Sequence, residues 1–135
     1  MTIGKRIVYI EDEEDTLQLV TLLLENNGYE VIGAPDGKSG LKAIKEHKPD
    51  LVLLDLMLPG MSGKAVFKHM KQDETLQNIP IIVITAWGDS SGVGISKDLV
   101  EDYILKPFGS KDLLNSLKKV LDKQKGLDDQ KRMGT

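Results

Sequence analysis

Residues 51–63 read LVLLDLMLPGMSG. An unbroken apolar run that ends at Asp55 is typical of a strand covered on both faces in a parallel sheet. Gly60 indicates a tight turn, since glycine adopts backbone angles that other residues avoid. Ser62 can cap a helix, because the apolar residues after it recur at helical spacing. The stretch therefore predicts a strand, a loop and a helix, with an aspartate at the carboxyl end of the strand.

The same pattern recurs along the chain. Further apolar runs occupy residues 7–10, 79–84 and 103–105, and a weaker run occupies residues 30–34. Helical patterns between and after these runs begin near Glu13, Asp36, Ser62 and Ser110. Alternation of strands and helices with short loops predicts an α/β fold with helices on both faces of a parallel sheet. Right-handed crossovers leave few topologies, among them the flavodoxin-like strand order 2-1-3-4-5.

Two segments depart from this regular pattern. Residues 88–96 contain three glycines where a fourth helix is expected, and each glycine costs about 1 kcal/mol in a helix interior. We expect a short, late-starting or mobile helix there. Residues 123–135 are polar and charged, so we expect a disordered tail after a single domain that spans residues 1–122.

The composition excludes several classes of protein. The chain has 135 residues, 29% of them charged, with a formal net charge of -3 and no cysteine. The net charge gives no general attraction to nucleic acid or anionic membranes, and disulfides and thiolate metal sites are excluded. We see neither a signal peptide nor a run approaching the roughly 20 apolar residues that span a bilayer. We therefore expect a cytoplasmic protein that does not insert into membranes.

Polar residues follow four of the five predicted strands. Glu11 and Asp12 follow the first strand, Asp55 the third, Thr85 the fourth and Lys106 the fifth. Ligands of open parallel sheets bind beyond the carboxyl ends of the strands, so these side chains should converge. Three neighbouring carboxylates repel one another unless a hard cation such as Mg²⁺ neutralises them. A carboxylate in such a site can attack phosphorus and form an aspartyl phosphate.

Four motifs carry a resemblance to a known family. They are IVYIEDE at residues 7–13, LVLLDLMLPGMSG at residues 51–63, IIVITA at residues 81–86 and DYILKPF at residues 102–108. Together they resemble the receiver domain of the two-component response regulators, from about Lys5 to Leu121. The resemblance implies a flavodoxin-like, doubly wound, five-stranded parallel sheet in the order 2-1-3-4-5, with five helices in three α/β/α layers.

The resemblance also implies a role for each acidic residue. Asp55 matches the phosphoryl acceptor of the family, and Glu11 and Asp12 match the acidic pair that binds Mg²⁺ or Mn²⁺ together with Asp55. Met57 lies where the family provides a backbone carbonyl as a metal ligand. The pair here is Glu-Asp rather than Asp-Asp. Because glutamate is longer by one methylene, Glu11 can reach the metal through water or from a shifted position.

Other positions match the residues that respond to the phosphoryl group. Thr85 and Lys106 match the conserved hydroxyl and lysine of the family, and Tyr103 matches its aromatic switch position. The bond between Lys106 and Pro107 resembles the cis peptide bond of the family, and proline is where a cis bond is energetically tolerable. Met57 and Trp87 resemble the positions that tune phosphoryl lifetime, where both bulky side chains would hinder the hydrolytic water.

The implied function is a phosphorelay switch rather than an enzyme. A sensor histidine kinase or histidine phosphotransfer protein would phosphorylate Asp55. The face formed by the fourth helix, fifth strand and fifth helix would then change its affinity for a protein target. We expect no direct contact with nucleic acid, and a monomer or a phosphorylation-dependent dimer. The target, and whether the receiver works alone or as part of a longer protein, are left open.

Three alternatives use the same residues differently. A haloacid-dehalogenase-type phosphatase would need a second acid two residues after its aspartate nucleophile, where this chain has Met57. A flavodoxin-type electron carrier would place hydroxyl groups after the first strand, whereas Glu11 and Asp12 would repel a flavin phosphate. A receiver-like module that works without phosphorylation is disfavoured, because every position that the chemistry needs is filled.

Overall fold

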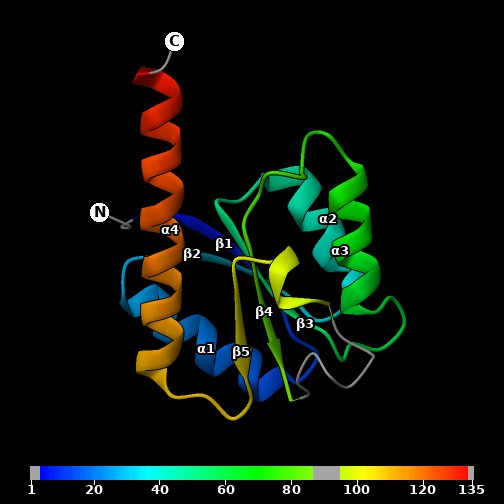
Figure 1. The fold of residues 1–135 in the computed structure, drawn as a ribbon. Helices are drawn as coiled ribbons and strands as arrows, with labels where there is room; N and C mark the ends of the chain where they lie inside the picture. Colours follow the sequence, from blue (N-terminus) through cyan, green and yellow to red (C-terminus); the bar gives the residue numbers. More distant parts are fainter. Residues whose placement is uncertain (1–3, 87–94, 134–135) are drawn as a thin grey trace.

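The sheet has the predicted topology. In the computed structural model, which describes residues 4–86 and 95–133, five parallel strands lie in the order β2-β1-β3-β4-β5 (Figure 1). Their bounds are β1 Arg6–Ile10, β2 Glu30–Ala34, β3 Leu51–Asp55, β4 Ile81–Thr85 and β5 Asp102–Leu105. Every residue of β3 and β4 is buried, as continuous apolar runs in a covered parallel sheet require.

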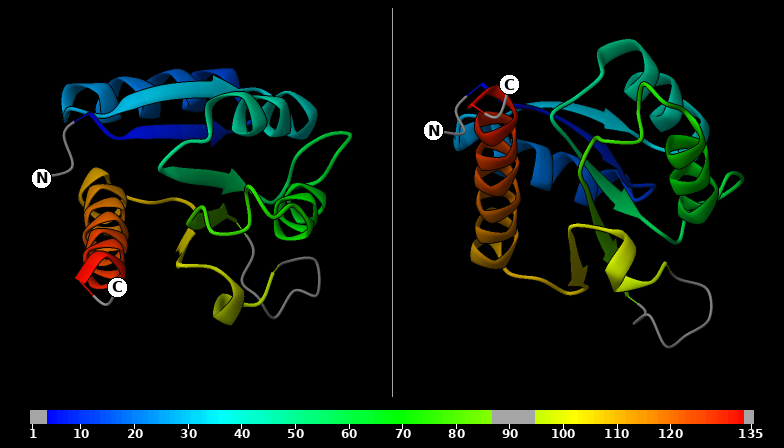
Figure 2. Two further views of the ribbon diagram at one scale, coloured as in Figure 1. Left: turned by 90° about the horizontal axis from the view of Figure 1, so that it is seen from above. Right: turned by 45° about the horizontal axis from the view of Figure 1, so that its top comes forward.

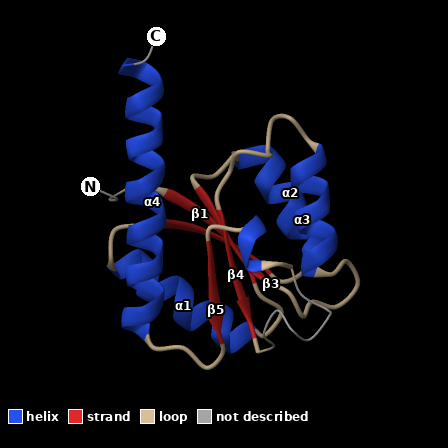
Figure 3. Ribbon diagram, in the orientation of Figure 1, coloured by secondary structure: helices blue, strands red, loops and turns tan. Residues whose placement is uncertain are grey.

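Helices cover both faces of this sheet. The described helices are α1 Glu14–Asn26, α2 Gly37–His47, α3 Gly63–Gln72 and α4 Ser110–Met133. Figure 2 shows α1 and α4 on one side of the strands and α2 and α3 on the other, and Figure 3 draws the helices in blue and the strands in red. Successive residues of a strand point to opposite faces, so Val8 and Ile10 pack beneath α2 and α3, whereas Ile7 and Tyr9 pack beneath α1 and α4.

Side-chain caps fix the start of two helices. Asp36 accepts a hydrogen bond from the Ser39 amide at 2.8 Å before α2, and Ser62 accepts one from the Ala65 amide at 3.2 Å before α3. Both residues are the caps predicted from the sequence. Gly60 has a φ of 69°, as expected for the turn between β3 and α3. The turn and the Ser62 cap determine where α3 begins relative to Asp55.

Two expectations require correction or qualification. Residues 123–133 do not form a disordered tail, because α4 continues as helix to Met133. Most of these residues are good helix formers, and no proline interrupts them. The domain boundary at residue 122 stays a prediction. Of the segment 88–96 in which a fourth helix was expected, residues 95–96 lie among the described residues and residues 88–94 do not. A 3₁₀ turn, η2, follows at Lys97–Leu99.

The described residues give no sign of a membrane span. None of the helices formed by residues 4–86 and 95–133 is both long enough and apolar enough to cross a bilayer.

Candidate functional site

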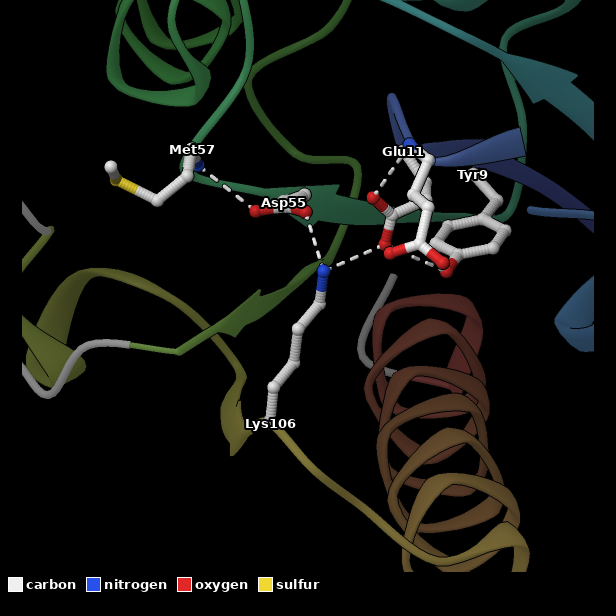
Figure 4. Close-up of polar contacts among 6 residues, drawn as sticks. Tyr9, Glu11, Asp55, Met57 and Lys106 are labelled. Atoms are coloured by element: carbon white, nitrogen blue, oxygen red, sulfur yellow. Dashed lines mark hydrogen bonds and ion pairs between the residues drawn. The ribbon is translucent and has the colours of Figure 1, made fainter. Parts of the chain in front are cut away.

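Neighbouring strand ends bring the predicted site residues together. In the parallel register, Ile10 of β1 pairs with Leu54 of β3, and Asp55 pairs with Ile84 of β4. Because strands of a parallel sheet end at the same edge, Glu11 and Asp55 lie side by side there. The side chain of Lys106, the residue directly after β5, extends toward both carboxylates, as Figure 4 shows.

Lys106 links two buried carboxylates. Its Nζ atom lies 2.8 Å from Oε1 of Glu11 and 2.8 Å from Oδ2 of Asp55. The Lys106 side chain is 27% exposed, whereas those of Glu11 and Asp55 are 1% and 4% exposed. Burial lowers the pKa of Lys106, but the hydrogen bonds and charges of Asp55 and Glu11 outweigh burial, so the pKa is raised overall. The lysine therefore stays charged and neutralises part of the negative charge of the site.

The carboxylate of Asp55 is held at both oxygens. Oδ1 accepts a hydrogen bond from the Met57 amide at 2.9 Å, while Oδ2 faces Lys106. Gly63, the first residue of α3, lies so close to the backbone of Asp55 and Leu56 that a Cβ atom there would meet both. The amide and this close helix contact keep Asp55 in one orientation at the end of β3.

Glu11 has partners that the sequence analysis did not identify. Its Oε2 atom accepts a hydrogen bond from the Glu13 amide at 3.2 Å, and its Oε1 atom accepts one from the Tyr9 hydroxyl at 3.4 Å. Burial and the nearby charges of Glu11 and Asp55 raise the pKa of Tyr9, so its hydroxyl stays protonated and can donate. Residues i and i+2 of a strand share a face, and this spacing was the available signal that Tyr9 could reach Glu11.

The acidic residues form a cluster suited to a hard cation. Glu11, Asp12 and Asp55 each offer a carboxylate oxygen, and these atoms all lie within 4.8 Å of one another. Glu11 and Asp55 are buried, whereas Asp12 is exposed and open to water. Mg²⁺ prefers oxygen ligands and keeps several of its waters, so two buried carboxylates beside an exposed one fit its requirements.

The structure also describes most of the remaining predicted residues. Thr85 is fully buried at the end of β4, and Tyr103 of β5 is partly buried against the core beneath α2 and α3. At Met57 the observed contact is the amide, the residue is 48% exposed, and the role of the carbonyl stays a prediction. The Lys106–Pro107 peptide bond is cis, as expected. Trp87 lies outside the described residues.

Comparisons with known proteins identify a family. The family model described as response regulator receiver domain matches residues 7–118. The phosphate regulon transcriptional regulatory protein PhoB of Escherichia coli is 38% identical over 119 residues, which cover 87% of this chain and 52% of PhoB. The chain thus spans about half the length of the curated relatives that it matches.

Solved structures resemble the whole fold. A CheY-like response regulator receiver domain protein from Methanospirillum hungatei superposes with a TM-score of 0.83 at 29% identity, covering 91% of this chain and 98% of that one. The receiver domain of a sensor histidine kinase from Pseudomonas aeruginosa gives a TM-score of 0.78 at 26% identity, covering 88% and 98%. That protein was solved with a magnesium ion coordinated in its active site cleft.

Proposed function

The chain belongs to the response regulator receiver domain family of two-component systems, and from this membership we propose that Asp55 is its phosphoryl acceptor. One observation carries the proposal. The buried Asp55 carboxylate lies 2.8 Å from the Lys106 ammonium and within a cluster of three carboxylates that suits a hard cation. A nucleophilic oxygen therefore stands beside a fixed positive charge, as phosphoryl transfer requires.

The proposed donor is the phosphohistidine of a sensor histidine kinase or a histidine phosphotransfer protein. An Asp55 oxygen forms a bond to phosphorus while the phosphorus–nitrogen bond breaks, and the departing imidazole keeps the electron pair. Lys106 stabilises the negative charge of the phosphoryl group, and the Met57 amide keeps the carboxylate aligned for attack. Glu11, Asp12, Asp55 and the Met57 carbonyl would hold Mg²⁺ (or Mn²⁺), which supplies further charge neutralisation when bound.

The proposed output is a change in protein binding, so the chain acts as a signalling module rather than an enzyme. Thr85 at the end of β4 would respond to the phosphoryl group, and Tyr103 on the neighbouring strand would follow it inward. The face formed by the η2 region, β5 and α4 supports such an output, because Leu99 and Leu105 are 56% and 51% exposed there. A phosphorylated form with a different affinity for its target would shift the population between two conformations.

The partners proposed for this chain are proteins. We propose a cytoplasmic receiver, monomeric or dimeric on phosphorylation, that contacts neither nucleic acid nor membrane directly. The relative PhoB is a transcriptional regulatory protein. An output through DNA would belong to a domain outside the stretch matched here.

Intact mass measurement tests the acceptor. Wild-type protein mixed with Mg²⁺ and acetyl phosphate should gain the mass of one phosphoryl group, and the gain should require Mg²⁺. Asp55→Ala should gain nothing, because the attacking carboxylate is absent. The same mass gain in Asp55→Ala would rule out Asp55 as the acceptor.

We further propose that Met57 and Trp87 prolong the phosphorylated state. Met57 lies two residues after Asp55, and its side chain is exposed. A bulky apolar group at this position can hinder the hydrolytic water. Met57→Ala should speed the loss of the phosphoryl group several-fold, equivalent to roughly 1 kcal/mol in the barrier. The decay is followed by intact mass after acetyl phosphate is removed. Leu19→Ala, which shortens a 69% exposed leucine on α1, serves as the control and should leave the decay unchanged.

A further inference from the structure

The ring of Tyr9 lies in the core, but its hydroxyl contacts a residue of the site. We propose that Tyr9 is a positioning residue, which becomes the main hydrogen-bond donor to Oε1 of Glu11 when Lys106 turns toward a phosphoryl group on Asp55. The proposal rests on the proposed function of Asp55 and Lys106. It goes beyond that function by assigning a role to a residue of the first motif that is not among the strand-end residues Glu11, Asp12, Asp55, Thr85 and Lys106.

The environment of Tyr9 indicates that its hydroxyl has a purpose beyond packing. The residue is fully buried in the core cluster beneath α1 and α4, where a phenylalanine ring would fill nearly the same space. Burying a hydroxyl without a partner is unfavourable, and the Tyr9 hydroxyl is directed at Glu11 (Figure 4). The ring thus places a polar group at the inner wall of the site.

Two donors share one oxygen of Glu11. Lys106 takes Oε1 at 2.8 Å, and the Tyr9 hydroxyl stands 3.4 Å from the same atom, at the long end for an O–H···O contact. Lys106 is therefore the closer of the two donors to Oε1. A phosphoryl group on Asp55 would offer the ammonium several charged oxygens, and it would replace the carboxylate contact that Lys106 now makes with Oδ2.

Oε1 of Glu11 would then lose the nearer of its two hydrogen-bond donors, while Oε2 keeps the Glu13 amide and the carboxylate remains part of the proposed Mg²⁺ cluster. The Glu11 side chain is 1% exposed, so water has little access to the oxygen that Lys106 leaves. The Tyr9 hydroxyl already faces that oxygen and can move closer. Its contribution therefore grows on phosphorylation, and a group that interacts more strongly with one state favours that state.

The contact with Tyr9 also depends on the length of the Glu11 side chain. An aspartate at this position would be shorter by one carbon–carbon bond, roughly 1.5 Å, and its carboxylate would stand farther from the Tyr9 hydroxyl. Tyr9 and Glu11 thus form a matched pair on one face of β1 and its extension. In a Glu11→Asp variant, the contribution of the Tyr9 hydroxyl should therefore vanish.

The experiment compares Tyr9→Phe with wild type in two binding titrations. Beryllofluoride at saturating Mg²⁺ serves as the probe of the phosphorylated state, and fluorescence of Trp87, the single tryptophan, reports binding. Tyr9→Phe should weaken beryllofluoride binding roughly three- to tenfold, the range for one hydrogen bond. The Mg²⁺ affinity without beryllofluoride should change less than about twofold, because Lys106 still serves Glu11 in that state.

Two controls separate this role from packing. Tyr29→Phe alters a buried tyrosine of the same core cluster that lies directly before β2, at the end of the strands opposite the site, and should leave both affinities unchanged. In a Glu11→Asp background, Tyr9→Phe should have no further effect on beryllofluoride binding. An equal loss in both backgrounds, or an unchanged affinity in Tyr9→Phe, would overturn the proposal. If wild type itself fails to bind beryllofluoride with Mg²⁺, the proposed function fails first.

Discussion

At the scale of single residues, Lys106 compensates the charge of the site. Glu11 and Asp55 are almost fully buried, and both direct an oxygen at the Lys106 ammonium. Two neighbouring carboxylates out of contact with water repel each other strongly once their counter-charge is removed. Lys106 therefore contributes to the stability of the fold as well as to the proposed chemistry.

Lys106→Met should destabilise the metal-free protein. We expect the free energy of unfolding to fall by about 1–3 kcal/mol, a range that allows for the partial exposure of the lysine. Urea unfolding in chelator-treated buffer measures this loss. Added Mg²⁺ should recover more stability in the variant than in wild type, because the cation replaces the missing charge. Equal stabilisation of both proteins by Mg²⁺ would contradict this account.

The raised pKa of Lys106 predicts the pH range in which the lysine stops stabilising the fold. A group with a higher pKa in the folded state contributes stability that is fully present below its unfolded pKa, about 10.4 for lysine. The contribution is lost as the pH rises through the higher folded pKa. The stability gap between wild type and Lys106→Met should be constant from neutral pH to about pH 9 and close above about pH 10.4. Lys119→Met, which removes a 67% exposed lysine, provides the matched control.

The sequence predicted which charged residues meet, but not all of their contacts. Glu11, Asp55 and Lys106 were expected to converge because each follows a strand of one parallel sheet. Tyr9 was missed, since a tyrosine within an apolar run is equally well explained as a core residue. Only the contact of its hydroxyl with Glu11 distinguishes the two interpretations.

At the scale of secondary-structure elements, the start of α3 is tied to the site by close packing. Gly63 is the first residue of α3, and a Cβ added to it would lie 2.7 Å from the Cα atom of Leu56 and still nearer the Asp55 carbonyl oxygen. Backbone atoms cannot yield as a flexible side chain can. The absence of a side chain at Gly63 therefore allows the helix to begin directly against the acceptor strand.

Gly63→Ala should destabilise the protein and disturb Asp55. We expect a loss of about 1–3 kcal/mol in the free energy of unfolding, as for overpacked interiors, and slower labelling by acetyl phosphate. Gly126→Ala is the matched control, because nothing lies within 4 Å of a Cβ atom at that position in α4. The control should lose no stability, because alanine has the higher helix propensity and any gain stays below about 1 kcal/mol. A neutral Gly63→Ala would show that α3 can shift without cost.

The elements differ in how well the sequence predicted them. The strands were predicted because a parallel sheet covered on both faces requires continuous apolar runs, and β3 and β4 are buried throughout. The caps Asp36 and Ser62 were predicted because a side-chain oxygen beside free helix amides has a direct physical role. The end of α4 was not predicted, since helix beyond the sheet lacks the apolar periodicity on which the prediction depends.

At the scale of the whole molecule, two core layers share one sheet. Alternate residues of the central strands pack into opposite layers, so each layer holds the carboxyl edge of the sheet in place. Among the α4 side chains that the structure describes, which extend to Leu127, the buried core residues lie in the first half of the helix, and they are Leu113, Leu117, Val120 and Leu121. Leu127, farther along, is 45% exposed. The stabilising part of α4 therefore ends near the domain boundary predicted at residue 122.

Truncation after Asp122 tests this division of α4. A chain of residues 1–122 should keep its free energy of unfolding within about 1 kcal/mol of the full chain, because Leu121 is the last core residue among the described side chains of α4. Leu117→Ala in the full chain should cost about 2–5 kcal/mol, since it opens a cavity in a fully buried position. Urea unfolding compares the three proteins, and acetyl phosphate labelling checks the site. A truncated chain as unstable as Leu117→Ala would mean that the end of α4 supports the core, because losing exposed helix alone cannot cost that much.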